Sequence, residues 1–421
     1  MTHYSYSNAQ LHCEAAAITA IAATVPTPFY IYSRKTYLEN YASIASAFRN
    51  RPHRICYALK ANSNLDLLRD FAAQGAGADV VSVGELKLAL RAGIPANAIV
   101  FAGVGKRDDE ILAGLEAGIR GFNVESEAEL QVINEIARQR GVIARVALRV
   151  NPNIDIHGHP YISTGRSADK FGIELARVRG LLREVREYQH IKLVGLHSHI
   201  GSLITELAPY AEVGKVMAQL GHEAIALGHE LDYLDVGGGL GVIYQNAIPV
   251  APNTEPVEGL ALSPSAVAEQ LTRPMADLKC ELIFEPGRAL VANCGALITR
   301  VLYIKHSGGK RFVVVDASMS DLIRPSLYNA HHQIVPVHMQ QRAMEKSEIV
   351  GPVCESGDFF AKERELEKVE RGDLLAIMTA GAYGFSLSSN YNARPRPAEV
   401  IVEGESFKIS RPRQELERVW E

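Results

Sequence analysis

From about residue 50 to residue 288, short runs of apolar and β-branched residues alternate with longer amphipathic segments, and this alternation constrains the fold more than any other feature. Strands that alternate with helices indicate parallel pairing through right-handed crossovers. Helical patterns lie between the runs, for example at 85–91, 127–140 and 211–227. The predicted strands lie at 55–59, 78–82, 99–102, 121–124, 145–150, 193–197, 233–236 and 281–284.

Eight such strand–helix units are the number that closes a (β/α)8 barrel, and a doubly wound open sheet is the alternative. Polar residues or glycines follow nearly every predicted strand. Barrel enzymes carry their sites at the carboxyl ends of the strands, so this placement favours an α/β fold of the barrel type. The residues at these ends are Lys60, Asp79, Asn151, His199, Gly237 and Glu285.

After Arg288 the pattern changes to strand-like pieces separated by Pro, Gly and Asn, which is typical of a mainly antiparallel β domain. We therefore predict a barrel domain at 36–288, followed by a β domain at 289–421 to which residues 1–35 contribute. The segment 28–33 is expected to add a strand, and the proline-rich segment 245–259 is expected to be a loop. The strand-like pieces lie at 296–306, 311–316, 348–350, 373–377 and 398–402.

The bulk composition excludes several classes of protein. The 421 residues carry 44 basic and 48 acidic side chains, a formal charge of −4, with no block of like charges, so we expect neither a nucleic-acid partner nor a membrane surface. The uncharged stretch 15–33 has no basic residue before it and is interrupted by Pro26 and Pro28. It therefore fits neither a signal peptide nor a spanning helix, and we expect a cytoplasmic protein.

The five cysteines lie far apart and form no C-x-x-C pair, so we expect reduced thiols rather than disulfides or a zinc site. The pair His197 and His199 has a spacing that metal sites also use. No cysteine or carboxylate lies close to it in the sequence, and we predict no metal site.

Lys60 ends the first barrel strand, in a context of small and apolar residues. A lysine held at the barrel mouth and partly desolvated favours the neutral amine, which can condense with an aldehyde. The alternative is a solvated lysine at the rim.

Glycines at 237–239 and 241 follow the seventh strand. Successive glycines let backbone N–H groups approach an oxyanion, and barrel phosphate sites cluster after strands seven and eight. A tight turn uses the same residues. After the sixth strand, the ring of His199 could stack on a flat cofactor and Ser202 could reach a phosphate, or each could be a hydrogen-bonded rim residue.

The eighth strand ends in Glu285-Pro286-Gly287-Arg288. A carboxylate followed by a turn and a guanidinium suits a protonated ring nitrogen and a substrate carboxylate, although a turn with a surface ion pair has the same sequence. An amine, a phosphate cradle, a stacking ring and a carboxylate on one rim together describe a pyridoxal-phosphate site.

Seven motifs occur in a characteristic order. They are Y-A-L-K-A-N at 57–62, H-S-H-I-G-S at 197–202, G-G-G-L-G at 237–241, E-P-G-R at 285–288, D-L-I-R-P-S-L-Y at 321–328, G-P-V-C-E-S-G-D at 351–358 and A-G-A-Y at 380–383. In these motifs the chain resembles the fold-type III pyridoxal-phosphate decarboxylases, which include ornithine and diaminopimelate decarboxylases. Within that family it is most similar to the diaminopimelate decarboxylases.

The resemblance implies a role for each matching position. Lys60 is expected to bind pyridoxal 5'-phosphate covalently, and Glu285 to pair with its ring nitrogen. Alanine racemases place an arginine at that position, so Glu285 favours decarboxylation. The other residues expected to bind the cofactor are Asp79, His199, Ser202, Gly238, Gly239, Gly287, Arg288 and Tyr383.

The resemblance also implies the groups that meet the substrate. Cys354 is expected to protonate the carbanion after carbon dioxide leaves, and in this family that cysteine comes from the partner subunit of a homodimer. Outside its motif, a lone cysteine would be interpreted as a buried structural thiol. The residues expected to bind the substrate are Arg288, Arg324, Tyr328, Glu355 and Tyr383.

The implied reaction is decarboxylation of meso-2,6-diaminopimelate to L-lysine and carbon dioxide. Glu355, next to the cysteine, suits the distal ammonium, and arginines suit the distal carboxylate. The loop at 151–172 resembles that of diaminopimelate decarboxylases as well. The rival is a decarboxylase of ornithine, arginine or lysine. A cofactor-carrying single-barrel binding protein is a non-enzyme alternative, which would lack the second domain and the C-E-S-G-D segment.

Overall fold

The computed structural model describes residues 2–156, 164–166, 169–250 and 259–420. Parts of the predicted loops at 151–172 and 245–259 lie outside the described residues. The chain forms two compact units. The barrel unit comprises Tyr41–Gly241 and Leu260–Gly287, and the β unit comprises Met1–Asn40, Val242–Gly259 and Arg288–Glu421.

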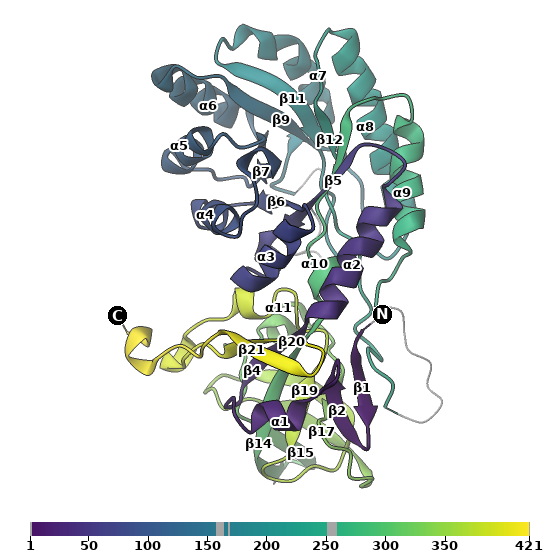
Figure 1. The fold of residues 1–421 in the computed structure, drawn as a ribbon, viewed down its shortest axis with the longest axis vertical. Coiled ribbons are helices and arrows are strands. Elements are labelled where there is room, and N and C mark those ends of the chain that lie inside the picture. Colours follow the sequence, from purple (N-terminus) through teal and green to yellow (C-terminus); the bar gives the residue numbers. More distant parts are fainter. Residues whose placement is uncertain (1, 157–163, 167–168, 251–258, 421) are drawn as a thin grey trace. The chain divides into compact units, whose positions relative to one another are not determined.

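In the barrel unit, eight parallel strands close into a ring, which confirms the predicted (β/α)8 barrel. Pairing of β8 with β9 completes the ring, and the helices lie outside the strands (Figure 1). Around the ring the strands are β5 (His53–Ala58), β6 (Gly77–Val80), β7 (Ile99–Phe101), β8 (Gly121–Val124), β9 (Ala144–Asn151), β11 (Ile191–His197), β12 (Tyr233–Asp235) and β13 (Glu281–Phe284). The short strand β10 (Ile173–Glu174) pairs with β9.

The helices of the barrel unit are α3 (Leu65–Ala73), α4 (Val83–Arg91), α5 (Asp108–Ala117), α6 (Glu127–Arg140), α7 (Leu175–Glu184), α8 (Ala208–Ala226) and α9 (Pro264–Thr272), and α2 (Arg34–Ala47) precedes β5. The three helical segments predicted by residue range begin and end within three residues of α4, α6 and α8 in the barrel unit. Asn64 and Ser82 cap two of the helices by accepting hydrogen bonds from backbone N–H groups in the first turn. Glycines in the left-handed conformation end two others, at Gly118 and Gly141.

Side chains from the strands fill the inside of the ring. One fully buried cluster draws its members from β5, β7, β9, β11, β12 and β13, so the barrel is a packed core rather than a channel. Strands covered on both faces have nearly continuous apolar sequences, which is why their runs are visible in the sequence. The members of the cluster are Cys56, Val100, Ala147, Val194, Tyr233 and Ile283.

The β unit is built around a mainly antiparallel sheet, which confirms the predicted type of domain. Its strand order is β18-β17-β15-β14-β4-β20-β21. The long strand β14 (Gly295–Ser307) pairs with β4 (Phe29–Ser33), so the predicted N-terminal strand lies in this sheet. Other strands are β15 (Lys310–Val315), β16 (Ile334–Pro336), β17 (Met344–Val350), β18 (Phe359–Glu367), β19 (Leu374–Ile377), β20 (Ala398–Glu403) and β21 (Ser406–Arg411).

Several elements of the β unit were not predicted. A small sheet of β1 (Tyr4–Ser7), β2 (Gln10–Cys13) and β3 (Ala16–Ala17) precedes α1 (Ile18–Ala22), and two short helices, α10 (Arg288–Val291) and α11 (Arg324–Tyr328), carry predicted site residues. Among the described residues, no helix combines the length and the apolar character needed to cross a membrane.

Candidate active site

Lys60 lies on a short 3-10 helix, Leu59–Ala61, directly after β5. Its Nζ atom lies 3.1 Å from Oδ2 of Asp79, at the end of β6. The Asp79 side chain is only 1% exposed, whereas that of Lys60 is 39% exposed. Burial, with the charge of Glu285, raises the pKa of Asp79, and Lys60 opposes this shift. The structure thus places the Lys60 amine beside a buried carboxyl group at the mouth of the barrel.

The glycine turn after β12 is closely packed against its neighbours. A Cβ atom on Gly238 would lie 2.1 Å from the carbonyl oxygen of Glu285, and one on Gly239 would lie 2.3 Å from that of Gly201. Gly239 also has a φ of +88°. Only glycine fits these two positions, so the backbone is free of side chains where a phosphate would approach.

The segment after β11 runs beside this turn. The Ile204 N–H donates to the carbonyl of Gly239 over 2.9 Å, and the Gly241 N–H donates to that of Ile204 over 3.0 Å. Ser202, the predicted phosphate ligand, lies two residues before Ile204 in this segment.

His199 forms a hydrogen bond with the same glycine turn. Its Nδ1 accepts a hydrogen bond from the Gly238 N–H over 3.1 Å, so the proton of a neutral ring lies on Nε2. Loss of solvation and the charge of Lys60 lower the pKa of His199 well below its ordinary value. A neutral ring is the form that this hydrogen bond requires.

Glu285 follows β13 and is 4% exposed. His197 Nε2 lies 3.2 Å from Glu285 Oε2, and Oε1 has no hydrogen-bond partner among the described residues. Burial opposes ionisation of Glu285, but His197, Asp235 and the charge of Lys60 outweigh it and lower its pKa. A buried, ionised carboxylate is the partner that a protonated ring nitrogen needs, so these residues fit a pyridoxal cofactor.

In the β unit, Arg288 and Arg324 both lie close to Tyr244. Arg288 Nη1 donates to the Tyr244 hydroxyl over 2.6 Å, and the Arg324 guanidinium lies 4.6 Å from the centre of the Tyr244 ring. Tyr383 contributes a second ring, 4.8 Å from the Arg288 guanidinium. Arg288 and Arg324 are 6% and 4% exposed, so water screens their charges little.

His332 fixes Arg324 from another direction. Its Nδ1 donates to the carbonyl of Met378 over 2.8 Å, which leaves Nε2 to accept from Arg324 Nη1 over 2.9 Å. Burial and the charge of Arg324 lower the pKa of His332 well below its ordinary value. The cluster of Arg288, Arg324, Tyr244, His332 and Tyr383 therefore presents two guanidinium groups in fixed positions.

The family model for the pyridoxal binding domain of pyridoxal-dependent decarboxylases matches residues 35–292. The chain belongs to the pyridoxal-dependent decarboxylases. The cofactor of this decarboxylase is pyridoxal phosphate. Its barrel strands end in the lysine, glycine turn, histidine and carboxylate described above.

Similarity extends beyond the barrel. The decarboxylase is 43% identical over 419 residues to diaminopimelate decarboxylase of Aquifex aeolicus, covering all of this chain and 97% of that protein. The crystal structure of diaminopimelate decarboxylase from Helicobacter pylori complexed with L-lysine is 41% identical, with a TM-score of 0.89 over 96% of this chain and 98% of that one. Lysine/ornithine decarboxylase from Vibrio vulnificus, at 20% identity, covers 92% of this chain and 97% of its own with a TM-score of 0.78, and shares the fold.

The segment 351–358 of the decarboxylase carries Cys354 and Glu355, both exposed. Asp358 anchors the segment because its carboxylate accepts from the N–H groups of Met319 and Val353, over 2.6 and 2.7 Å. The Cys354 N–H donates to Asn392 over 3.5 Å, and the hydrogen bonds found for these two residues do not include the arginine cluster. Cys354 is not the buried structural thiol that its residue type alone favours.

The structure therefore gathers the predicted residues in two groups. Lys60, Asp79, His199, Glu285 and the glycines lie at one end of the barrel, where Gly287 packs against Ala58 and Ala61. In the β unit, Arg288, Arg324 and Tyr383 lie together, and Tyr328 interacts electrostatically with Arg288. Sequence reasoning missed Tyr244, His332 and Asp235.

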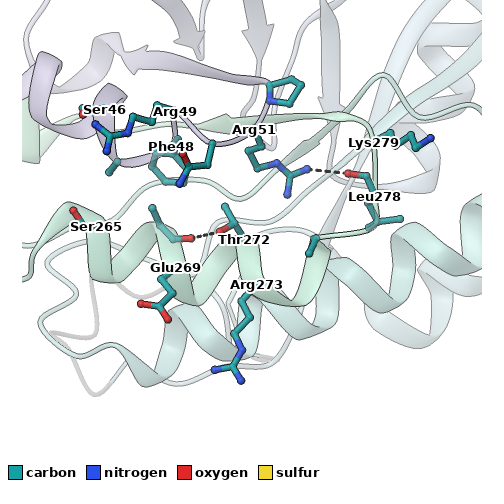
Figure 2. Close-up of a pocket in the computed structure, with 15 residues that line it drawn as sticks. Ser46, Phe48, Arg49, Arg51, Ser265, Glu269, Thr272, Arg273, Leu278 and Lys279 are labelled. Atoms are coloured by element: carbon teal, nitrogen blue, oxygen red, sulfur yellow. Dashed lines mark hydrogen bonds between the residues drawn. The ribbon is translucent and has the colours of Figure 1, made fainter.

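A cavity of about 850 Å³ lies elsewhere on the decarboxylase (Figure 2). Its walls come from residues 46–52, before β5, and 265–279, before β13, which places it at the amino-terminal ends of the strands. Arg51 donates to the carbonyls of Leu278 and Cys280 there, over 3.3 and 3.0 Å. That end of a barrel serves stability rather than catalysis, so the cavity is not the candidate site.

Proposed function

We propose that this chain is a diaminopimelate decarboxylase, which converts meso-2,6-diaminopimelate to L-lysine and carbon dioxide in the last step of lysine biosynthesis. The observation that carries the proposal is the 43% identity to a diaminopimelate decarboxylase along the whole chain. The bound molecule named for the Helicobacter pylori relative, L-lysine, is the product of this reaction.

The barrel residues hold the cofactor in this proposal. Lys60 binds it covalently, Asp79 stays beside Lys60, and Ser202 with the backbone of Gly238, Gly239 and Gly287 holds the phosphate. His199 stacks on the ring, and Glu285 accepts a hydrogen bond from the ring nitrogen. When bound, pyridoxal phosphate supplies an electron sink for the charge left by the departing carbon dioxide.

The β-unit residues bind the substrate. Arg288, Arg324 and Tyr328 bind the distal carboxylate, while Tyr383 contacts cofactor and substrate. Two almost fully buried guanidinium groups favour a carboxylate strongly, because charge-assisted pairs gain strength where water is excluded. Diaminopimelate brings this second carboxylate, and ornithine, arginine and lysine do not.

Cys354 delivers a proton to the substrate carbon after carbon dioxide leaves, and Glu355 binds the distal ammonium. We propose that both come from the partner subunit of a homodimer. The exposure of both side chains in this chain supports that assembly. The five free cysteines suit a reducing compartment, and we propose the cytoplasm. We also propose residues 36–288 as the cofactor-binding domain.

The test is carbon-dioxide release from meso-diaminopimelate by the purified, cofactor-loaded protein, with ornithine, arginine and lysine in parallel assays. We expect release from diaminopimelate at a kcat/KM at least about 100-fold above the others, since the lost carboxylate leaves buried arginines unpaired. Release only from a monocarboxylate would keep the cofactor and overturn the substrate.

A further inference from the structure

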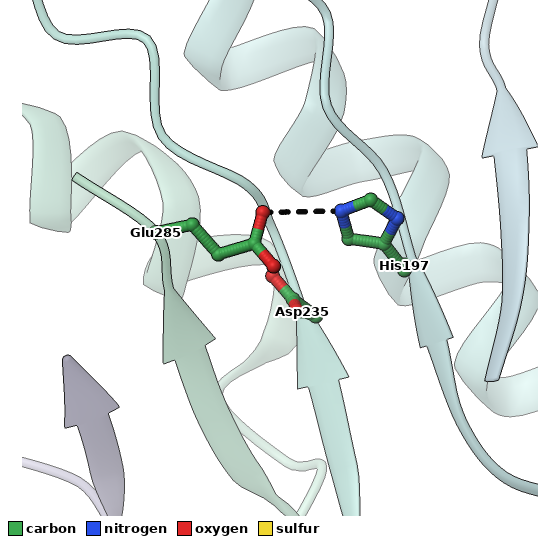
Figure 3. Close-up of side chains that lie close together, drawn as sticks. All are labelled: His197, Asp235 and Glu285. Carbon is green, nitrogen blue, oxygen red and sulfur yellow. Dashed lines mark hydrogen bonds and ion pairs between the residues drawn. The ribbon is translucent and has the colours of Figure 1, made fainter. Parts of the chain in front are cut away.

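Three buried side chains converge at the carboxyl ends of neighbouring barrel strands (Figure 3). His197 ends β11, Asp235 ends β12, and Glu285 follows β13, so they come from three neighbouring strands of the barrel. Their exposed fractions are 1%, 0% and 4%. One nitrogen or oxygen atom from each lies within 4.8 Å of the others.

The contacts of the two carboxyl groups are unequal. Glu285 Oε2 faces His197 Nε2 over 3.2 Å, whereas Asp235 Oδ1 accepts from the Gly237 N–H over 3.0 Å. No donor among the described residues reaches Asp235 Oδ2 or Glu285 Oε1. In Figure 3 the second oxygen of Glu285 points toward the Asp235 carboxyl group.

Two ionised carboxylates this close repel each other strongly in a buried site. One proton between them replaces the repulsion with a hydrogen bond, and the pair then carries a single negative charge. Burial, reinforced by the charge of Glu285, raises the pKa of Asp235 well above its ordinary value, while that of Glu285 is lowered. The proton therefore belongs on Asp235.

The other titratable groups around the pair agree with this assignment. Asp79 on β6 and Cys56 on β5 add no positive charge that would stabilise a second carboxylate at Asp235. The positive charge of Lys60 acts on Glu285. Glu285 thus has His197 beside one of its oxygens and the positive charge of Lys60 nearby. Asp235, in contrast, accepts a hydrogen bond only from the backbone N–H of Gly237 among the described residues.

We propose that Asp235 is a positioning residue whose protonated carboxyl group donates a hydrogen bond to Glu285 and holds it ionised toward the ring nitrogen of the cofactor. This inference rests on the proposed role of Glu285. Asp235 does not touch the reacting atoms, and it acts through Glu285. Its second contact, with the Gly237 N–H, joins the ring-nitrogen site to the glycine turn.

The location of the proton can be measured without an activity assay. Infrared spectra of the full-length holoenzyme should contain the carbonyl band of a protonated carboxyl group, which is absent from the Asp235→Asn variant. Isotopic labelling of aspartate carboxyl carbons with ¹³C should shift this band. A band that survives Asp235→Asn and shifts only when glutamate is labelled would overturn the proposal.

A matched pair of variants tests the effect on Glu285. Asp235→Asn keeps a neutral donor and the acceptor for Gly237, and we expect the apparent Kd for pyridoxal phosphate, measured by cofactor absorbance, to stay within about threefold. Asp235→Leu has a similar volume and no donor, and we expect the Kd to rise about ten- to 100-fold. Equal losses in both variants would mean that Asp235 is ionised, and the proposal would fail.

A double-mutant cycle separates positioning from simple structural damage. If Asp235 acts through Glu285, then Asp235→Leu should weaken cofactor binding less than about threefold in a Glu285→Gln background. Full additivity would contradict the coupling. Because the infrared band does not depend on turnover, a protein without decarboxylase activity that still shows the aspartate band would refute the proposed reaction and leave this inference standing.

Discussion

The carboxyl end of the barrel and the segment 351–358 both carry predicted catalytic residues, yet they are built differently. At the barrel end, Asp79 and Glu285 are 1% and 4% exposed, and each has a fixed neighbour. In the segment, the backbone is anchored by buried Asp358, while Cys354 and Glu355 are exposed.

The difference in exposure between the two regions matches two different tasks, cofactor binding and proton delivery. A cofactor that stays bound through many turnovers needs polar groups that are positioned in advance, and the barrel provides them through packing and hydrogen bonds. A proton donor for a substrate that enters and leaves needs access. An exposed thiol on an anchored backbone suits completion by another surface, in agreement with the proposed homodimer.

At the barrel end, the largest effect is expected from Lys60→Ala. We expect loss of the absorbance of covalently bound cofactor and a drop in activity of more than about 1,000-fold, because the proposed covalent bond forms through this amine. Absorbance spectra and carbon-dioxide release measure the two effects. Lys192→Ala, an exposed lysine on the same barrel, serves as the control. An unchanged cofactor spectrum in Lys60→Ala would refute the assignment.

The proposed role of segment 351–358 is tested by the variant Cys354→Ala. Removal of a proton donor costs about 100- to 10,000-fold in turnover, whereas cofactor absorbance and Tm should stay unchanged because the side chain is exposed. Cys280→Ala, directly before β13, is the matched cysteine control and should turn over normally. Normal turnover by Cys354→Ala would remove it from the mechanism.

A smaller effect is expected from Tyr244→Phe, which removes the hydroxyl group that accepts from Arg288. The KM for diaminopimelate should rise about tenfold, since a hydrogen bond to a charged group positions this guanidinium. Burial alone would raise the pKa of Tyr244, but Arg288 and Arg324 outweigh it and lower that pKa. Tyr303→Phe, on an exposed tyrosine of the same unit, is the control. Equal KM values for both variants would contradict a positioning role.

The smallest effect concerns the pH dependence of stability. Burial raises the pKa of Glu85 from 4.5 to about 7, although Val81 and Lys60 oppose the shift. The folded state therefore binds more protons than the unfolded state between pH 4.5 and 7, and this group makes the free energy of unfolding fall as pH rises through that window. At pH 8, Glu85→Gln should raise the stability by about 1–3 kcal/mol, with little change at pH 4. Denaturant unfolding at both pH values measures this, and a gain that is equal at pH 4 and pH 8 would contradict the assignment.

The sequence predicted the barrel because its strands are buried on both faces and therefore appear as continuous apolar runs. Lys60, His199 and Glu285 were identifiable because each lies where such a run ends. The charged strand β18 was missed because its polar residues, such as Lys362 and Glu365, obscure the strand pattern. The strands β1 to β3 were missed because they have only two to four residues each.

The missed site residues share a different cause. Asp235 is the last residue of β12, and its local sequence does not distinguish it from an ordinary strand residue. Its proposed role depends on its proximity to Glu285, 50 positions further along the chain. Tyr244 lies in a glycine- and proline-rich stretch, which predicts a loop. Both acquire their roles through long-range contacts, which single-sequence patterns do not record.

The hydrogen bond from the Gly238 N–H to His199 couples the glycine turn to the histidine ring, which matters for engineering this enzyme by mutation. The turn proposed to receive the phosphate also sets which ring nitrogen of His199 carries the proton. A library that varies this turn would therefore also alter the hydrogen bond that orients the ring proposed to stack on the cofactor. Phosphate binding by the turn and the orientation of the His199 ring would therefore change together in such a library.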